Sequence, residues 1–334
     1  MTQLSSSRSS SEETVSRLLS KNQTLHTPCR NFLSITDLQP NEIEECLTIA
    51  AELKAQRSSV RPEPTSNVLG GAHVALLFEK PSLRTRTTFE IAVHELGGHV
   101  VEPQQAVTFG DRESPEDVAR NLERWISIAV IRTFAQHRLE QFAAAAPGMH
   151  VINALTNEEH PCQALADLLT LKEHWKDLRG GTLAFIGDSN NVATSIVHAS
   201  MMLGINLNFA SPADYDLPTS LREDAARLAR HGAKLKLYRD PAEAVQEAHA
   251  VYTDAWTSMG QEEELEKRQK AFMPYQVNTK LMAQAKPDVL FMHCLPAHRG
   301  QEVTAEVLDS PNSIVFEQAE NRLHTQKAIL LMMS

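Results

Sequence analysis

Apolar residues along this chain gather into short uninterrupted runs that alternate with stretches of helical spacing. The first set of runs predicts strands near 73–79, 98–102, 127–133 and 149–153. A second set predicts strands near 182–187, 205–210, 234–238, 249–253, 288–293 and 313–316. Helical spacing predicts intervening helices, most clearly at 40–56, 114–125, 138–146 and 161–175. This alternation is typical of parallel sheets covered by helices on both faces.

The two sets of strands predict an α/β fold with two doubly wound parallel-sheet domains and an interdomain cleft. A chain of 334 residues, 42% of them hydrophobic, exceeds the usual size of a single core. We expect one domain over 28–175, joined by a C-terminal helix at 318–334, and a second domain over 180–317. The serine-rich residues 1–27 are predicted to be a disordered tail, and two acidic residues, Glu12 and Glu13, count against a mitochondrial transit peptide.

Charge and composition narrow the classes of partner. The formal net charge is −10 and the basic residues are dispersed, so neither nucleic acid nor an anionic membrane is predicted as a partner. No apolar stretch approaches the roughly 20 residues that a membrane-spanning helix needs. The four cysteines, Cys29, Cys46, Cys162 and Cys294, contain no Cys-x-x-Cys pair. This spacing predicts no disulfide framework and fits a reducing, cytoplasmic location.

A basic, hydroxyl-rich turn follows the first predicted strand. Ser82, Leu83, Arg84, Thr85 and Arg86 lie between the apolar run and the next helix. At a helix N-terminus, unpaired backbone N–H groups favour an anion, and an arginine offers a planar fork that matches phosphate oxygens. The turn therefore predicts a phosphate site, although a solvated helix start with ordinary caps would explain the same residues.

A second motif, His160-Pro-Cys-Gln163, opens the predicted helix at 161–175. Pro161 suits the first helical turn, and the positive end of the helix dipole favours a neutral imidazole at His160. A neutral histidine donates a hydrogen bond to a carbonyl without carrying charge, and Gln163 adds an amide one turn along. The alternative is a histidine that only caps the helix.

Polar residues also follow the strands of the second block. The turn at 187–195 has the position of a dinucleotide loop but only one of its three glycines, so NAD is not predicted. Asn190 and Asn191 instead present amides at a helix start, where a carboxylate is held. Asp254, just past a strand, suits a cationic amine. The thiol of Cys294, at the end of another strand, is either a reactive group or an inert buried cysteine.

The segment that contains Cys294 also carries residues of the types that bind zinc. His293, Cys294 and His298 are all potential ligands, but they lie on a strand end and a proline turn without a convincing fourth ligand. We therefore predict no metal.

Taken in order, these motifs resemble the aspartate/ornithine carbamoyltransferase family over about residues 28–334, most closely its ornithine-using members. The family's Ser-Thr-Arg-Thr-Arg is similar to 82–86, its isolated arginine to Arg132, its His-Pro-x-Gln to 160–163, its His-Cys-Leu-Pro to 293–296, and its C-terminal arginine to Arg322. Two departures are Leu83, in place of the usual threonine, and Thr108, where ornithine-using members often carry glutamine.

The resemblance implies transfer of a carbamoyl group from carbamoyl phosphate to the side-chain amine of L-ornithine, giving citrulline and phosphate, in arginine biosynthesis or breakdown. It implies no metal or organic cofactor, and a homotrimer or a multiple of one. Residues 28–175 would bind carbamoyl phosphate and 180–317 ornithine. The implied carbamoyl-phosphate contacts are Ser82, Leu83, Arg84, Thr85, Arg132, His160, Gln163, Cys294, Leu295 and Arg322. The implied ornithine contacts are Asn191, Asp254, Ser258 and Met259, and the implied catalytic residues are Asp254, Cys294, Arg84 and His160.

Two alternatives stay open from sequence. A related carbamoyltransferase would use another acceptor, such as putrescine or aspartate, although aspartate calls for additional cationic groups. A non-catalytic, anion-binding regulatory protein could share the same fold.

Overall fold

The computed structural model describes residues 31–57, 66–103, 113–257 and 264–334. Contacts divide the chain into two compact units. The first unit contains the residues up to Leu165 together with Asn321–Ser334, and the second contains Ala166–Glu320. The predicted disordered tail at 1–27 lies outside the described residues, as do Thr108, Ser258 and Met259.

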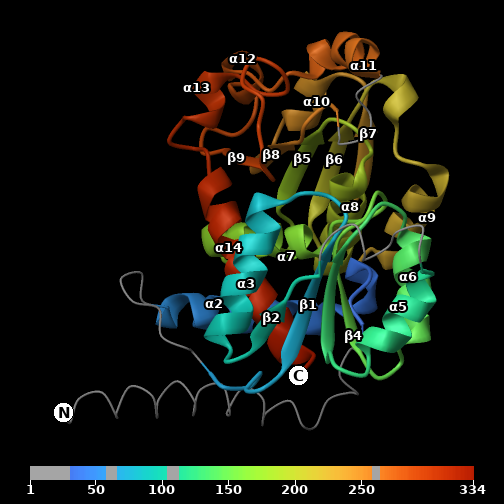
Figure 1. The fold of residues 1–334 in the computed structure, drawn as a ribbon. Coiled ribbons are helices and arrows are strands. Elements are labelled where there is room, and N and C mark those ends of the chain that lie inside the picture. Colours follow the sequence, from blue (N-terminus) through green and yellow to red (C-terminus); the bar gives the residue numbers. More distant parts are fainter. Residues whose placement is uncertain (1–30, 58–65, 104–112, 258–263) are drawn as a thin grey trace, which may run out of the picture. The chain divides into compact units, whose positions relative to one another are not determined.

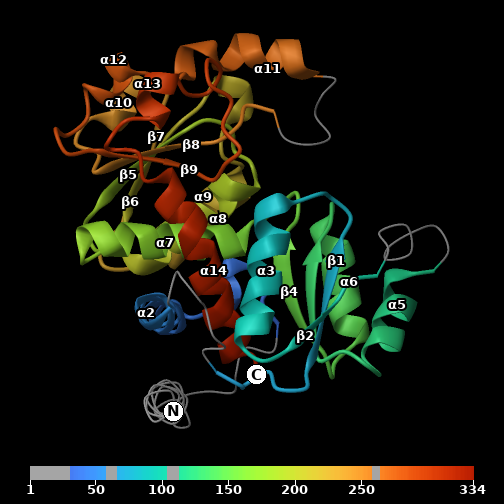
Figure 2. The same cartoon turned by 60° about the vertical axis from the view of Figure 1, so that its left-hand side comes forward.

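The first unit contains a parallel sheet of four strands in the order β2-β1-β3-β4. Its strands are β1 (His73–Phe78), β2 (His99–Val101), β3 (Ile128–Arg132) and β4 (His150–Leu155). Its helices are η1 (Ile35–Asp37), α2 (Pro40–Gln56), α3 (Leu83–Glu95), α5 (Pro115–Leu122) and α6 (Gln136–Ala145). Helices α5 and α6 cover one face of this sheet and α3 the other (Figures 1 and 2).

Burial on both faces explains why these strands read as continuous apolar runs. Side chains alternate across a strand, so Ala75 and Leu77 of β1 join Phe142 of α6 in one core cluster. Val74 and Leu76, which point to the opposite face, are also buried. A strand covered on both faces therefore reads as a nearly continuous apolar run.

The second unit contains a parallel sheet of five strands in the order β7-β6-β5-β8-β9. Its strands are β5 (Thr182–Ile186), β6 (Asn206–Ala210), β7 (Leu235–Tyr238), β8 (Ala250–Thr253) and β9 (Leu290–His293). Its short helices are η2 (Ala213–Tyr215), α10 (Pro241–Val245), η4 (Met273–Tyr275), α12 (Thr279–Met282) and α13 (Ala305–Leu308). Its longer helices are α8 (Asn191–Leu203), α9 (Thr219–Leu228) and α11 (Leu265–Phe272). The two remaining helices, α7 (Pro161–Trp175) and α14 (Val315–Met332), each begin in one unit and end in the other.

Aromatic packing stabilises the centre of the second sheet. The ring of Phe185 in β5 stacks on Phe209 in β6 at 5.6 Å between centroids, and it also contacts Tyr252 in β8 at 5.3 Å. On the other face, Ile186 packs in a cluster with Trp256 and Phe272. Residues at the carboxyl ends of β5 and β8 are therefore fixed by a core on both sides.

Each sheet has one point at which the strand order reverses. In the first sheet the chain passes from β1 outward to β2 and then returns to β3, and in the second it passes from β5 to β7 and then returns to β8. In open parallel sheets, ligands bind outside the carboxyl ends of the strands at such a switch point. The switch points lie next to 79–86 and Arg132 in the first unit, and next to 187–191 and Asp254 in the second.

The predicted fold class is confirmed, since two parallel α/β sheets of four and five strands are present. The predicted strand at 313–316 is wrong. Ser313 makes only an isolated bridge with Phe291, and α14 begins at Val315, three residues before the predicted C-terminal helix. Ile314 and Val315 are buried while Phe316 is exposed. A short apolar run at the start of a buried helix has the same pattern as a buried strand.

In the part of the chain that the structure describes, no helix combines the length and the apolarity needed to cross a lipid bilayer.

A buried group of charges attaches the end of α14 to α3. Lys327 Nζ lies 2.8 Å from Glu95 Oε2, and Arg57 Nε lies 2.9 Å from Glu95 Oε1. His324, one turn before Lys327, is also buried. Burial, followed by the positive charges of Lys327, Lys54 and Arg57, lowers the pKa of His324 to about 3.

This low pKa predicts that acid destabilises the fold through His324. Unfolded His324 binds a proton near pH 6.5 and folded His324 does not, so the free energy of unfolding falls as the pH drops below 6.5. Between pH 6.5 and 4.5 the loss is on the order of 2 kcal/mol. Urea unfolding at both pH values measures it. His324→Gln should show a smaller loss than the unmodified chain, and equal losses would contradict the assignment.

Candidate functional site

The predicted phosphate turn caps α3 in the first unit. Ser82 is the N-cap residue, and its Oγ accepts a hydrogen bond from the backbone N–H of Thr85 at 3.3 Å. Leu83 is the first helical residue, and its side chain is 79% exposed. It lines a pocket of about 860 Å³ together with Ser82, Pro81 and Arg86. The exposed leucine leaves its backbone N–H at the positive end of the helix, so the departure from threonine removes a hydroxyl and no backbone donor.

Three of the predicted residues meet in one buried hydrogen-bonded group. The Arg322 guanidinium, in α14, donates to Thr85 Oγ1 at 2.6 Å and to Gln163 Oε1 at 2.8 Å. Each of the three residues is at most 3% exposed. Both of these acceptors are neutral, so neither compensates the charge of Arg322.

Positive charge surrounds His160 at the start of α7. Burial, followed by Arg322, Arg132 and Arg84, lowers the pKa of His160 well below its usual value. The imidazole is therefore neutral at pH 7, as predicted. The cause is burial and three arginines in addition to the helix dipole on which the prediction depended.

One further cation, Lys80, enlarges this positive region. Arg132, at the end of β3, is buried and lowers the pKa of Lys80, for which burial is the larger cause. Lys80 Nζ donates to Asn157 Oδ1 at 2.6 Å. Among the described residues, the Arg84 guanidinium makes no hydrogen bond or ion pair. Several cations gathered in a partly buried site are typical of an anion-binding site.

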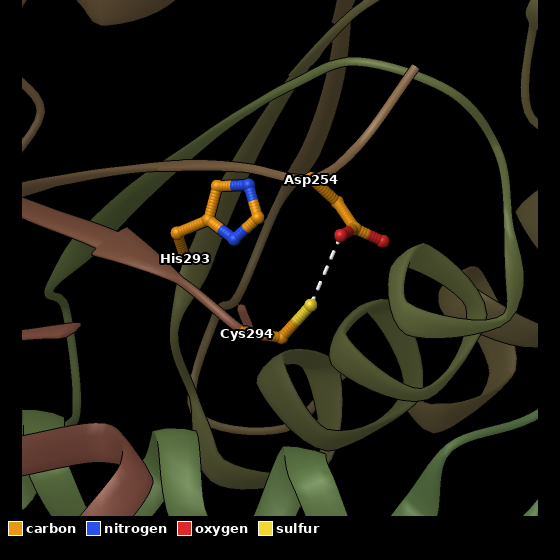
Figure 3. A group of neighbouring side chains, drawn as sticks. All are labelled: Asp254, His293 and Cys294. Atoms are coloured by element: carbon orange, nitrogen blue, oxygen red, sulfur yellow. Dashed lines mark hydrogen bonds between the residues drawn. The ribbon is translucent and has the colours of Figure 1, made fainter. Parts of the chain in front are cut away.

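The predicted residues of the second unit meet at its switch point. Cys294 Sγ donates to Asp254 Oδ1 at 3.0 Å, as Figure 3 shows. The other carboxylate oxygen of Asp254 accepts from Asn190 Nδ2 at 2.7 Å, and Oδ1 also accepts from the backbone N–H of Ala255. The carboxylate is thus fixed in direction by three donors at the strand ends. It offers a negative charge beside a thiol.

His293 lies beside this pair but is held by other groups. Its Nδ1 accepts from the backbone N–H of Leu295 at 2.8 Å, and its Nε2 lies 3.2 Å from Glu302 Oε1. Burial opposes ionisation of Glu302, but hydrogen bonds from His293 and the His298 backbone lower its pKa overall. Leu295, with φ of 59°, has a left-handed conformation that this contact helps to hold.

Asp254, His293 and Cys294 each offer an atom of a type that binds metal ions. Ligand atoms of Asp254, His293 and Cys294 all lie within 4.8 Å of one another (Figure 3). Because both ring nitrogens of His293 are engaged within the chain, the group does not present a free imidazole nitrogen. His298 contacts Glu302 and belongs to that separate pair.

The structure adds Lys80 to the predicted residues and gives Asn190 a partner that the sequence did not indicate. Asn190, the N-cap of α8, contacts Asp254, whereas the predicted Asn191 is the first helical residue. Lys80 lies among the cations of the first unit. An asparagine immediately before a helix is a recognisable cap, but its second contact depends on the neighbouring strand end. The predicted Ser258 and Met259 lie outside the described residues.

The fold and the two switch-point sites define an α/β protein with a cluster of cations in its first unit and a carboxylate–thiol pair in its second. Residues 30–173 match the family described as "Aspartate/ornithine carbamoyltransferase, carbamoyl-P binding domain", and residues 179–333 match "Aspartate/ornithine carbamoyltransferase, Asp/Orn binding domain". The chain belongs to the aspartate/ornithine carbamoyltransferase family.

Individual relatives agree with this assignment. The chain is 46% identical to the ornithine carbamoyltransferase of Geobacillus stearothermophilus over 305 residues, which are 90% of this chain and 96% of that protein. It is 45% identical over 304 residues to the ornithine carbamoyltransferase of Methanocorpusculum labreanum, covering 90% and 97%. The solved structure of the Pyrococcus furiosus ornithine carbamoyltransferase superimposes with a TM-score of 0.86 at 42% identity, covering 91% of this chain and 96% of that one.

Proposed function

We propose that this protein transfers the carbamoyl group of carbamoyl phosphate to the side-chain amine of L-ornithine, yielding L-citrulline and inorganic phosphate. The observation that carries the proposal is the neutral, buried His160 beside Arg84, Arg132 and Arg322. A dianionic phosphate that carries a neutral carbonyl matches this combination of cations and an uncharged hydrogen-bond donor. The many relatives named ornithine carbamoyltransferase support ornithine as the acceptor.

Arg84, Arg132 and the start of α3 would bind the phosphate. The Arg84 guanidinium has a planar fork that matches two phosphate oxygens, and the N-terminal amides around Leu83 and Thr85 add backbone donors. As the bond between carbonyl carbon and phosphate oxygen breaks, negative charge grows on the leaving group. Donors already fixed around that group stabilise the transition state more than the bound substrate.

His160, Thr85 and Arg84 would polarise the carbamoyl oxygen. A neutral imidazole donates a hydrogen bond to that oxygen without adding a charge that would compete for the phosphate. Gln163 and Arg322 would contact the carbamoyl phosphate from the helices that carry them, and the backbone of Leu295 would add a further contact. These groups direct the carbonyl carbon toward the attacking amine.

Asp254 and Cys294 would bind and deprotonate the acceptor. Asp254 attracts the ornithine ammonium groups, with Ser258, Met259 and Asn191 at the α-amino and α-carboxylate groups. The side-chain ammonium gives one proton to the Asp254–Cys294 pair, and the free amine forms a bond to the carbonyl carbon. The carbon–oxygen bond to phosphate then breaks, and the second amine proton leaves with the phosphate. Alignment of the two substrates supplies much of the rate enhancement, because no covalent bond between the protein and a substrate is required.

We also propose how these roles divide along the chain and where the protein works. Residues 28–175, joined by 318–334, bind carbamoyl phosphate, and 180–317 bind ornithine. Cys46, Cys162 and Cys294 form no disulfide within the described residues, which fits the cytoplasm. The family resemblance implies a homotrimer or a multiple of one. Sedimentation equilibrium tests this assembly, and a monomeric mass would contradict it.

Competition among acceptor amines tests the proposed reaction. The chain is incubated with carbamoyl phosphate and, in separate and mixed reactions, with ornithine, putrescine, lysine, N-acetylornithine or aspartate. We expect the value of kcat/KM for ornithine to exceed those of the other amines by at least about 10²-fold, since Asp254 with a carboxylate site selects a zwitterion that carries a second amine. A preference for another amine would keep the phosphate assignment and overturn the acceptor. Phosphate binding without transfer to any amine would favour the regulatory alternative.

A further inference from the structure

A buried chain of hydrogen bonds in the second unit joins β9, α14, α7 and β8. The backbone N–H of His293 donates to Gln318 Oε1 at 3.0 Å. Gln318 Nε2 donates to Asp167 Oδ1 at 2.9 Å, and the Tyr252 hydroxyl donates to Asp167 Oδ2 at 3.0 Å. All four residues are at most 1% exposed. We call this group the Asp167–Gln318 network. None of its side chains has a role in the proposed transfer.

The network lies one helical turn from residues that bind carbamoyl phosphate in the proposed function. Asp167 follows Gln163 by four positions on α7, and Gln318 precedes Arg322 by four positions on α14. Arg322 in turn donates to Gln163 at 2.8 Å. The same two helices are therefore joined at two successive turns, first by Gln163 with Arg322 and then by Asp167 with Gln318.

The network also reaches the strand that carries the thiol. Gln318 holds the backbone of His293, and the next residue is Cys294, whose thiol donates to Asp254. Tyr252, two residues before Asp254 on β8, is held by the same Asp167 carboxylate. The Asp167 carboxylate and the Gln318 amide thus hold the ends of β8 and β9 against α7 and α14.

We infer that Asp167 and Gln318 are positioning residues for carbamoyl transfer, setting the register of α7 and α14 and thereby the places of Gln163, Arg322 and Cys294. The inference depends on the proposed function for its catalytic meaning. In the proposed function neither residue contacts a substrate.

The donor pattern of this network has a single consistent arrangement. The Asp167 carboxylate accepts two hydrogen bonds, so the amide of Gln318 must direct its NH₂ group toward Asp167 and its oxygen toward the N–H of His293. Burial, with the negative charge of Asp167 as a smaller cause, raises the pKa of Tyr252 well above its usual value, which keeps its hydroxyl a donor. Exchanging the carboxylate and the amide between positions 167 and 318 would preserve all three hydrogen bonds and the net charge.

Comparing the two single variants with the double variant tests the positioning role. In Asp167→Asn, the new NH₂ group faces the NH₂ of Gln318, or the Tyr252 hydroxyl, so one donor is left without an acceptor. In Gln318→Glu, two buried carboxylates meet, and one must bind a proton. The double variant Asp167→Asn/Gln318→Glu restores the three hydrogen bonds that join His293, Gln318, Asp167 and Tyr252. We expect each single variant to lower kcat/KM for carbamoyl phosphate and the affinity for inorganic phosphate on the order of tenfold, and the double variant to recover most of both.

Two measurements separate a positioning role from a general loss of stability: the pH dependence of kcat/KM in Gln318→Glu, and a comparison of two tyrosine variants. The deficit of Gln318→Glu relative to the unmodified chain should shrink as the pH falls, because protonation removes the repulsion between its two carboxylates. Tyr252→Phe and Tyr275→Phe form a matched pair, since both delete a buried hydroxyl that donates within the second unit. Only Tyr252→Phe should change KM for carbamoyl phosphate, whereas both lower the thermal midpoint.

The possible results distinguish this inference from the proposed function. If the unmodified chain forms citrulline but the single variants keep its kcat, KM and phosphate affinity, the positioning role is overturned and the proposed function stands. Equal effects of Tyr252→Phe and Tyr275→Phe, or a double variant no better than the sum of the singles, would also overturn it. If the unmodified chain forms no citrulline, the proposed function fails, and the phosphate affinities of the two single variants and the double variant at 167 and 318 still decide whether the network positions Gln163 and Arg322.

Discussion

Arg84→Ala is expected to lower kcat for citrulline formation by about 10²-fold or more. The Arg84 guanidinium makes no hydrogen bond or ion pair to the residues that the structure describes, and it contributes to the low pKa of the buried His160. In the proposed reaction it contacts the phosphate while the leaving group gains charge. Loss of one such donor typically lowers kcat by about 10²- to 10³-fold. Steady-state kinetics with saturating ornithine measures the effect.

Two comparisons separate this role from a general effect of charge. Arg84→Lys keeps the charge and loses the planar fork, so we expect it to recover only part of the activity. Arg120→Ala removes an exposed guanidinium, paired with Asp117 in the same unit, and should change kcat by less than about twofold. A loss of less than about threefold in Arg84→Ala would exclude its contact with the transition state.

Asp254→Asn is expected to lower the turnover of ornithine strongly. It should leave the binding of phosphate nearly unchanged. The Asp254 carboxylate accepts from Cys294, Asn190 and Ala255, and in the proposed reaction it attracts the ornithine ammonium and accepts its proton with Cys294. An amide of the same shape has no charge and cannot take that proton. We expect kcat/KM for ornithine to fall by 10² to 10⁴, in order of magnitude, while the affinity for inorganic phosphate stays within about twofold.

A matched carboxylate provides the control for this variant. Asp309 lies in the same unit, is exposed and pairs with Arg299. Asp309→Asn should leave kcat/KM for ornithine unchanged within about twofold, because an exposed ion pair contributes little. If Asp254→Asn weakened phosphate binding as strongly as ornithine turnover, the carboxylate would have a structural role shared by both halves of the reaction.

Much of the fold follows from local pattern. Strands buried on both faces leave apolar runs such as 74–78 and 183–186, and helices begin at prolines such as Pro40 and Pro161, so the alternation of elements is readable from sequence. The strand predicted at 313–316 is wrong for a physical reason. A helix that starts in a core presents two or three adjacent apolar residues before its period becomes apparent.

The site divides in the same way. Residues that act through a local context, such as Ser82 at a helix start or Asp254 after a strand, are identified by their position along the chain. Asn190 and the Asp167–Gln318 network are different. Asp167 and Gln318 lie 151 positions apart, and each looks like an ordinary polar residue near the start of a helix. Their partners depend on which helices the fold places together, which local pattern does not contain.

An isotope label at the carbonyl carbon follows the carbamoyl group from donor to acceptor. The chain is incubated with ornithine and carbamoyl phosphate carrying ¹³C at the carbonyl carbon, and the products are followed by NMR. Transfer of the carbamoyl group predicts that the label appears in the ureido carbon of citrulline, with one phosphate released for each labelled citrulline, and that Arg84→Ala slows both equally. Label recovered as carbonate or cyanate, with ornithine unchanged, would contradict the account.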